Sequence, residues 1–207
     1  MSILEKLESC LNHRDEKPNE RLAEEIAKKN NSKAIQELIE NLNNKNKDIQ
    51  NDCIKVLYEI GKRKPKLISS YGKDFIALLD NKNNRLQWGA MTALDCITME
   101  NPEIIYKSLP KIIAVAEGGS VITKDHAVSI LIKLCAVKKF REGAFELLVE
   151  QLKNSLPNQL PMYAENSLPI INEENKNVFI KTLTIRLKDI EKETKRKRVE
   201  NVIKKLT

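Results

Sequence analysis

Two neighbouring residues, Asp125 and His126, are of the types that make an acid/base pair. A carboxylate beside an imidazole is a common arrangement in general acid–base catalysis. Adjacent residues of a helix, however, point about 100° apart and do not face each other. We therefore favour a simpler interpretation, in which Asp125 lies near the positive end of a helix dipole and takes part in no reaction. The other histidine, His13, lies in a polar segment and supports no catalytic assignment.

Catalytic and metal-binding signatures are otherwise absent from the sequence. It contains no phosphate-binding loop, no G-x-G-x-x-G, no H-E-x-x-H and no G-x-S-x-G. The four cysteines are widely spread and form no C-x-x-C pair: Cys10, Cys53, Cys96 and Cys135. This spacing argues against a zinc site or a disulfide framework and favours reduced thiols in the cytoplasm. We therefore expect a chain without enzyme activity, metal or cofactor.

The composition indicates a soluble protein with a modest basic excess. The 207 residues include 36 Lys and Arg against 29 Asp and Glu, for a formal charge of +7. No apolar run approaches the ~18–20 residues that span a bilayer, and the N-terminus lacks the basic-then-apolar pattern of an export signal. Basic proteins often bind nucleic acid or acidic partners, but a small excess is a weak indicator, so the distribution of charge matters more.

The single tryptophan, Trp88, lies within a helical pattern but off its apolar face. Residues 84–97 read NRLQWGAMTALDCI, and their apolar members recur at helical spacing. These members are Leu86, Ala90, Ala93, Leu94 and Ile97. The position of the largest side chain therefore needs an explanation from the elements around it.

An ungapped internal repeat with an offset of 37 residues organises most of the chain. Residues 41–60 align with residues 78–97. The offset continues through three columns, which stand at i, i+4 and i+7 of one helical face. The columns are Cys53, Ala90, Ala127 and Ala164; Leu57, Leu94, Leu131 and Leu168; and Ile60, Ile97, Leu134 and Ile171. Each repeat therefore predicts a hairpin of two helices.

We name the first helix of each hairpin the A helix and the second the B helix. The A helices are expected near residues 32–43, 66–80, 103–117, 140–154 and 176–190. The B helices are expected near residues 47–62, 84–99, 121–137, 158–171 and 193–206. An additional N-terminal pair is expected at 2–12 and 19–30. Kinks are expected at residues 72–73 and 109–110, the latter because proline removes a backbone donor.

These units resemble the HEAT and armadillo repeat families. Residues 109–116, LPKIIAVA, are similar to the A helix of a HEAT unit, and residues 85–94, RLQWGAMTAL, to its B helix. The turns are rich in asparagine where the family pattern has acids, and Gln50, Gln87 and Lys124 stand at the family's basic position. The resemblance implies an all-α fold, a right-handed α-α superhelix of about five to six antiparallel helix pairs.

On this basis the chain is expected to be a single domain over residues 1–207. An N-terminal capping helix pair would occupy residues 1–31, because the end of a stack needs a polar cap. Four repeats of about 37 residues would follow over residues 32–171, and a basic capping pair over residues 172–207.

The resemblance also implies that the B helices line a concave groove. Two columns of the repeat then project into this groove: Asn51, Trp88, Asp125 and Met162, followed one turn later by Lys55, Thr92, Ser129 and Asn166. Trp88 is either an anchor for a partner or a packing residue against the next repeat, and both interpretations stay open. We expect a non-enzymatic scaffold that binds a protein or peptide along this groove. The sequence predicts no membrane contact and no particular oligomeric state.

The C-terminal residues 191–205 are strongly basic and most so at Lys195, Arg196, Lys197 and Arg198. They form either a solvated cap or a contact for phosphate or an acidic partner. The second interpretation keeps an alternative function open, a nucleic-acid-binding HEAT-like domain. Alkylpurine DNA glycosylases with a HEAT-like stack carry aromatic and aspartate side chains in the groove, and Trp88 with Asp95 or Asp125 is similar. Aromatic residues make up only 4% of the chain, which disfavours that catalytic version.

Overall fold

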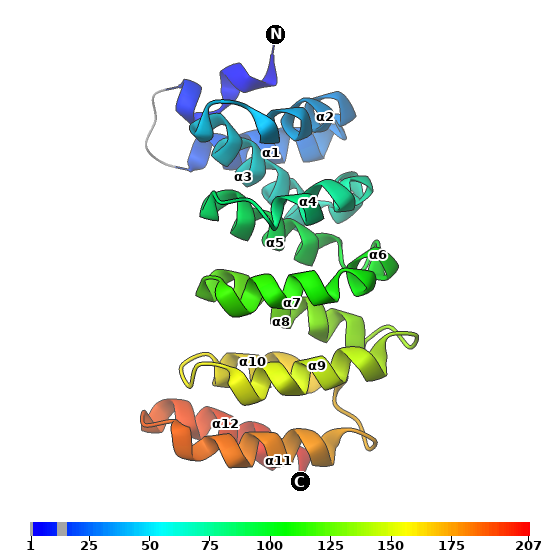
Figure 1. The fold of residues 1–207 in the computed structure, drawn as a ribbon, viewed down its shortest axis with the longest axis vertical. Helices are drawn as coiled ribbons and strands as arrows, with labels where there is room; N and C mark the ends of the chain where they lie inside the picture. Colours follow the sequence, from blue (N-terminus) through cyan, green and yellow to red (C-terminus); the bar gives the residue numbers. More distant parts are fainter. Residues whose placement is uncertain (1, 12–15) are drawn as a thin grey trace. The chain divides into compact units, whose positions relative to one another are not determined.

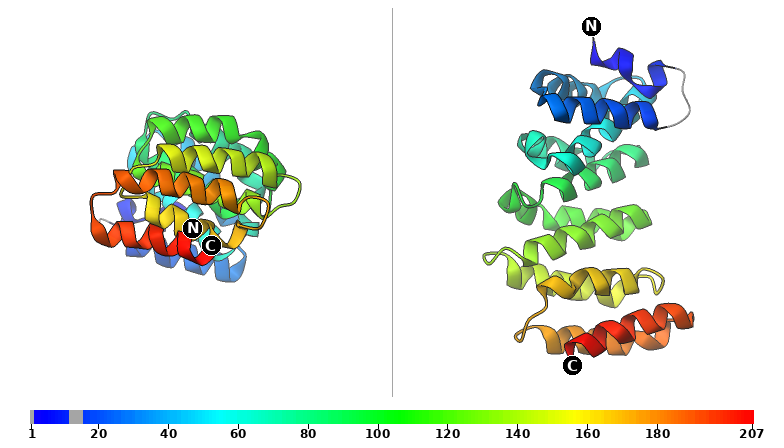
Figure 2. Two further views of the ribbon diagram at one scale, coloured as in Figure 1. Left: turned by 90° about the horizontal axis from the view of Figure 1, so that it is seen from below. Right: turned by 180° about the vertical axis from the view of Figure 1, so that it is seen from behind.

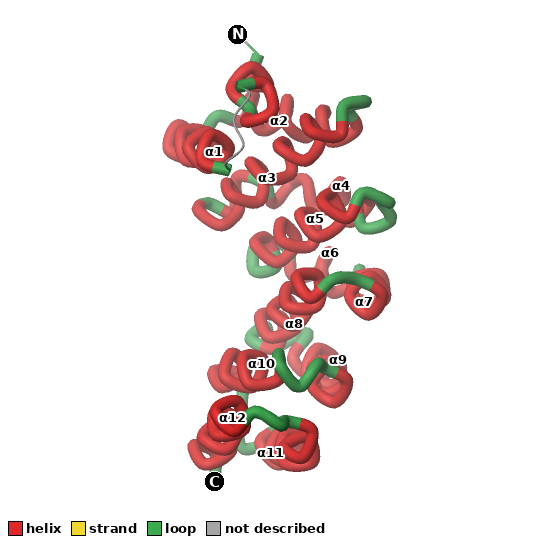
Figure 3. Tube along the Cα trace, turned by 90° about the vertical axis from the view of Figure 1, so that its left-hand side faces the viewer, coloured by secondary structure: helices red, strands yellow, loops and turns green. Residues whose placement is uncertain are grey.

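A computed structural model describes residues 2–11 and 16–207 of the chain. Within these ranges the secondary structure consists of helices and the loops between them, without a strand (Figures 1 and 3). The expected all-α class is therefore confirmed. Residues 12–15, which include His13 and part of the predicted N-terminal turn, lie outside the described residues, as does Met1.

The chain divides into two compact units, Met1–Ala127 and Val128–Thr207, and the boundary falls inside helix α8 (Val121–Cys135). The assignment of residues 1–207 to one domain, with capping pairs at both ends, stays a prediction.

The first unit begins with short 3₁₀ turns where a helix over residues 2–12 is expected. These turns span Ile3–Lys6 and Glu8–Cys10, and Leu7 between them is fully buried. Helix α1 (Lys17–Lys29) follows at the position of the second predicted N-terminal helix, and Asn30 ends it with a left-handed backbone. A single buried leucine thus anchors the N-terminal segment in place of a continuous apolar helix face.

Helix hairpins build the rest of the first unit. The A helices α2 (Ser32–Glu40) and α4 (Gly72–Leu78) pack against the B helices α3 (Lys47–Arg63) and α5 (Asn84–Ile97), respectively. Helix α3 also packs against both α1 and α5, so it is the central helix of this part of the unit (Figure 1).

Two A helices are broken where kinks are expected. The helix predicted at 103–117 is divided into α6 (Pro102–Lys107) and α7 (Leu109–Gly118), with Pro110 in the first turn of α7. Proline is tolerated there because the first helical N–H groups have no partner within the helix. The helix predicted at 66–80 begins instead with two 3₁₀ turns, Pro65–Leu67 and Ser69–Tyr71, before α4 starts at Gly72.

Asparagine side chains organise the turns that precede the B helices α3 and α5. Asn46 caps α3 by accepting from the Asp48 backbone N–H at 2.8 Å. Asn83 caps α5 by accepting from the Arg85 backbone N–H at 3.0 Å, and its amide also donates to Asn51 Oδ1 at 2.9 Å. A side-chain oxygen at this position supplies an acceptor that the first turn of a helix otherwise lacks. Asparagine therefore caps these helices, a role that the acidic residues of the family pattern can also fill.

The glutamines at the family's basic position also bind their own turns. Gln50 Nε2 donates to the Asn44 carbonyl at 2.7 Å, and Gln87 Nε2 donates to the Leu79 carbonyl at 2.9 Å. Both bonds tie the start of a B helix to the chain that leads into it. The two glutamines are 37 residues apart, whereas their acceptors, Asn44 and Leu79, are 35 apart.

The second unit contains two further hairpins. Its helices are α9 (Arg141–Asn154), α10 (Leu160–Ser167), α11 (Lys176–Arg186) and α12 (Glu193–Leu206). Helix α9 packs against α10 and α11, and α12 packs against α10 and α11. In the right-hand view of Figure 2, α12 (red) lies against α11 (orange).

The repeat columns form the buried core of the B helices. The small residues of the first column are all fully buried: Cys53, Ala90, Ala127 and Ala164. The other two columns are fully buried in the first three copies, whereas Leu168 and Ile171 of the fourth are half-buried. Helix α10 ends at Ser167 because Pro169 forces a 3₁₀ turn, Leu168–Ile170, in place of its last turn. The fourth copy therefore departs from the repeat only after its first core position.

Candidate functional site

An aromatic pair occupies the B-helix surface of the first unit. The ring of Trp88 on α5 lies 5.7 Å from the ring of Tyr58 on α3, with the planes tilted by 50°. Tyr58 is only 3% exposed, whereas Trp88 is half-buried. Aromatic pairs at this separation and tilt are mutually attractive. One part of Trp88 is thus fixed against the fold while another part stays accessible.

The predicted groove residue Lys55 lies beneath this surface, in a network of carboxylates. Its side chain is 7% exposed, and its ammonium lies 2.8 Å from Glu16, 3.3 Å from Glu20 and 3.1 Å from Glu59. Arg85, at the start of α5, binds the other oxygen of Glu16 at 3.0 Å. A buried ammonium needs such partners, because leaving it unpaired in the interior costs several kcal/mol. Lys55 therefore joins α1 to α3, and its ammonium is paired with carboxylates of the chain itself.

Glu59 is the buried acid of this network. Burial by itself would raise the pKa of Glu59, but hydrogen bonds from Arg63, Lys62 and Lys55 outweigh it and lower the pKa to about 2. Burial would likewise lower the pKa of Lys55, but its hydrogen bond to Glu16 and its interactions with Tyr58 and Glu59 raise it above its ordinary value. Both groups are therefore charged at neutral pH.

The other groove residues predicted in the first unit differ in accessibility. Asn51 is half-buried and accepts from Asn83. Thr92 is 3% exposed, and its hydroxyl donates to the Trp88 carbonyl at 2.9 Å within α5. Asp125 is half-buried. Trp88 is therefore the large, partly accessible side chain among them.

A histidine–aspartate pair that was not predicted from the sequence lies beside these residues. His126 Nδ1 is 2.8 Å from Asp95 Oδ2, across 31 residues of sequence. Asp95 is 8% exposed and His126 is half-buried. In the sequence, Asp125 was the partner considered for His126, because the two residues are adjacent. One sequence feature could have indicated Asp95 as the partner, because Asp95 stands on the same face of its B helix as Thr92 and Trp88.

The remaining predicted groove residues belong to the second unit. Met162 and Asn166 lie on α10, where Met162 is half-buried and Asn166 is exposed. Ser129 lies on α8 and is half-buried. The side chains of Met162, Asn166 and Ser129 carry a thioether, an amide and a hydroxyl, respectively.

The four basic residues at positions 195–198 of the C-terminal helix α12 bind groups within the second unit. Lys195 Nζ donates to Asn158 Oδ1 at 2.8 Å, and Arg196 donates to the Ile190 carbonyl at 2.7 Å. Lys197 pairs with Glu193 at 2.7 Å. Arg198 donates from Nε and Nη2 to the two carboxylate oxygens of Glu165, at 2.8 and 2.5 Å, and these bonds join α12 to α10. These contacts suit a helix that closes the unit.

Cysteines and metal-binding groups form no cluster in the described ranges. The four cysteines are free, and burial raises the pKa of Cys53 and of Cys135 to about 12. Over residues 2–11 and 16–207, no group of three or more His, Cys, Asp or Glu side chains is placed to hold a metal ion. In the same part of the chain, no helix has the length and apolar character needed to cross a membrane.

Stacked helix hairpins with buried small residues in their B helices define a HEAT/armadillo-type helical-repeat protein, as the sequence resemblance implied. The family model described as "Sister chromatid cohesion protein PDS5 protein" matches residues 19–173. The match covers more than half of the chain, and the chain belongs to this family. No curated protein matches it.

Solved structures share this fold at low sequence identity. A designed armadillo repeat protein in complex with the peptide (KR)4 has a TM-score of 0.66 and 13% identity, covering 99% of this chain and 98% of that one. A computationally designed armadillo repeat protein for modular peptide recognition has a TM-score of 0.63 and 14% identity, with coverages of 99% and 98%. An engineered protein from the Northeast Structural Genomics Consortium has a TM-score of 0.61 and 20% identity, with coverages of 99% and 100%. These likenesses establish the fold alone.

Proposed function

We propose that this chain is a non-enzymatic, cytoplasmic scaffold that binds a protein or peptide segment along its B helices, with Trp88 as an anchor. The observation that carries the proposal is the half-buried ring of Trp88, held against the buried ring of Tyr58. A rigid aromatic side chain loses little conformational entropy when a partner covers it, and tryptophan is enriched among binding hot spots.

The charges around Trp88 favour a polypeptide held by its shape, backbone and apolar side chains. Lys55 and Arg85 are both paired with Glu16, and Glu59 is surrounded by cations. An ionic partner would have to compete with these pairs. The designed armadillo protein in complex with the peptide (KR)4 supports a polypeptide as the class of partner that such a fold accommodates.

A random peptide library displayed on phage provides the test. Selected peptides are synthesised, and their binding is followed by the fluorescence of Trp88, the sole tryptophan. For Trp88→Ala, which lacks this signal, binding is followed with a fluorescein label on the peptide. We expect Trp88→Ala to weaken binding by at least about 2 kcal/mol while the chain stays folded. The control is Leu156→Ala, which removes a 48% exposed apolar side chain from the second unit and should bind normally.

Two outcomes count against the anchor. Peptides that bind Trp88→Ala and the unaltered chain equally well would place the binding surface elsewhere. A large loss of stability in Trp88→Ala would assign this side chain to packing instead.

The alternative, a nucleic-acid-binding function, is tested by measuring the binding of a DNA duplex. Salt-dependent binding of the duplex to the unaltered chain would support that alternative, provided that the double variant Arg196→Glu with Arg198→Glu loses this binding. The exchanged pair Glu165→Arg with Arg198→Glu keeps the ion pair between α10 and α12 while it reverses the charge at position 198. Lost DNA binding in this variant would therefore reflect the charge at position 198 and not the packing of α12.

A further inference from the structure

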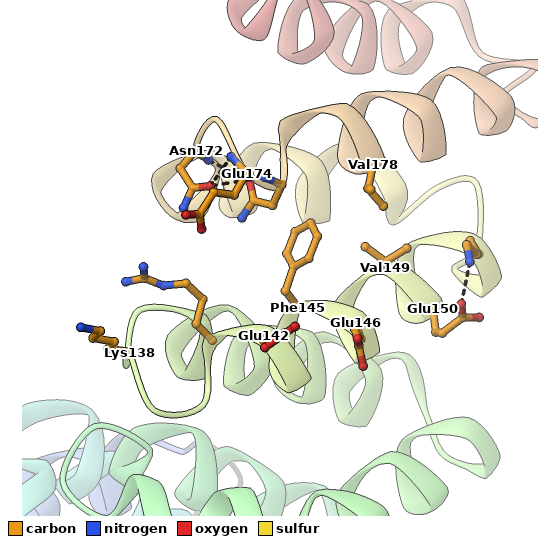
Figure 4. A pocket seen from close by; sticks show the side chains of 12 residues that line it. Lys138, Glu142, Phe145, Glu146, Val149, Glu150, Asn172, Glu174 and Val178 are labelled. Carbon is orange, nitrogen blue, oxygen red and sulfur yellow. Dashed lines mark hydrogen bonds and ion pairs between the residues drawn. The ribbon is translucent and has the colours of Figure 1, made fainter.

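A second candidate surface lies in the second unit, on the A helices. A cleft of about 730 Å³ runs between α9 and α11 and reaches the loop that precedes α11 (Figure 4). Its lining residues come from α9, from that loop and from the first turn of α11, together with Lys138 in the loop that precedes α9. It contains none of the groove residues on the B helices.

The floor of the cleft is apolar and incompletely covered. Phe145 projects from α9 toward α11, and Val178 on α11 faces Val149 on α9 (Figure 4). Val178 is 51% exposed, and Phe145 is half-buried. Apolar side chains left open in a concave site are typical of docking surfaces.

Glutamates line the same cleft in a regular row. Glu142, Glu146 and Glu150 are four residues apart and therefore follow one face of α9, and Glu174 lies in the facing loop. Glu150 pairs with Lys153 at 2.6 Å. Glu142, Glu146 and Glu174 make no ion pair within the described ranges. Counted over its lining residues, the cleft has four acids and three bases (Lys138, Arg141 and Lys153), a net of −1, against +7 for the whole chain.

We propose that this cleft docks a basic amphipathic helix of a protein partner. The apolar stripe of such a helix would cover Phe145 and Val178, and lysines or arginines spaced one turn apart would match the glutamate row. Lys138 lies at the opposite end from Glu150 (Figure 4). It would meet the C-terminal end of the docked helix, which carries partial negative charge. This docking is independent of the function proposed for Trp88.

The test uses two fluorescein-labelled peptides of about 18 residues, long enough for five helical turns. One carries leucine and lysine in an amphipathic helical pattern, and the other replaces each lysine by glutamate. Long-range attraction to a chain of charge +7 favours the acidic peptide. We expect the basic peptide to bind at least about 10-fold more tightly, as measured by fluorescence polarisation, which would indicate local recognition.

Variants of the cleft locate the binding. Val178→Asp and Glu146→Lys should each weaken binding of the basic peptide by about 10-fold or more. Glu173→Lys is the matched control for charge, because Glu173 is 88% exposed outside the cleft, where it pairs with Lys176. This control and Trp88→Ala should bind as the unaltered chain does. Circular dichroism checks that every variant is folded.

Three results would overturn the proposal. The first is an acidic peptide that binds as tightly as the basic one. The second is normal binding of the basic peptide by Val178→Asp. The third is a dimer, detected by light scattering, that Val178→Asp dissociates, because a second copy would then cover the cleft.

Discussion

The Asp95 carboxylate lies 2.8 Å from His126 Nδ1 and thereby joins α5 to the start of α8 within the first unit. Each residue belongs to the B helix of a different repeat. The contact is thus a polar link between neighbouring hairpins, beside the apolar columns that form their core. Its most direct consequence is for stability.

Replacing His126 by alanine should destabilise the first unit by about 1–2 kcal/mol, because a buried carboxylate loses a hydrogen-bond partner. Urea unfolding measures the loss. The same substitution in an Asp95→Ala background should cost clearly less, since the interaction is then already absent. An equal cost in both backgrounds would show that His126 stabilises the fold by other contacts.

The network around Glu59 predicts acid sensitivity. The pKa of Glu59 lies at about 2 in the folded chain against an ordinary value of 4.5, so its charged form stabilises the fold above pH 4.5. This contribution, at most about 3 kcal/mol, is lost as the pH falls through the folded pKa. Denaturant unfolding at pH 6 and at pH 2.5 measures it.

A Glu59→Gln variant is the control for this acid response. It should be less stable than the unaltered chain at pH 6, and the difference should shrink at pH 2.5 because glutamine does not titrate. A difference that is the same at both values would remove Glu59 from the acid response.

Gly89 should not tolerate a side chain, although it lies inside helix α5. A Cβ at this position would lie 2.7 Å from Ile54 Cγ1 and 3.1 Å from its Cγ2. We expect Gly89→Ala to cost about 1–3 kcal/mol through overpacking, in spite of the better helix propensity of alanine. Gly118→Ala is the matched control, because no atom lies within 4 Å of its added Cβ. Thermal unfolding of the two variants should therefore shift in different directions or by clearly different amounts.

The small residues of the first repeat column predict a similar cost for added volume. Ala127 is fully buried, and Ala127→Leu should destabilise the fold by about 1–3 kcal/mol. Ala114 is exposed on α7, so Ala114→Leu should change stability by no more than about 0.5 kcal/mol. Equal melting curves for the two variants would count against the repeat alignment.

Local signals in the sequence are sufficient to predict most of the helices. The 37-residue columns place Cys53, Ala90, Ala127 and Ala164 at equivalent buried positions, because a repeat must bury the same helical face in each copy. Proline and glycine mark the breaks at Pro110 and Gly72, since proline lacks a backbone N–H donor and glycine has a low helix propensity. The N-terminal segment is predicted less well, because two short 3₁₀ turns and a helix show a similar apolar spacing.

The candidate sites are predicted only in part. The register places Trp88 on the B-helix surface, but it also places Lys55 there, and nothing in the sequence indicates that three carboxylates surround its ammonium. The cleft beside Phe145 and Val178 is not predicted, because its walls come from two A helices that are separated by α10 in the sequence.

The sequence by itself determined the helical repeat, the small core residues and the basic character of the last helix, since these follow from spacing and composition along the chain. Only the tertiary structure decided which charges are neutralised and which side chains stay accessible. His126 pairs with Asp95 and not with its neighbour Asp125, and Trp88 rests on Tyr58. The reason is that such partners meet through the packing of one hairpin on the next, so their identity depends on distances between helices that a linear pattern does not contain.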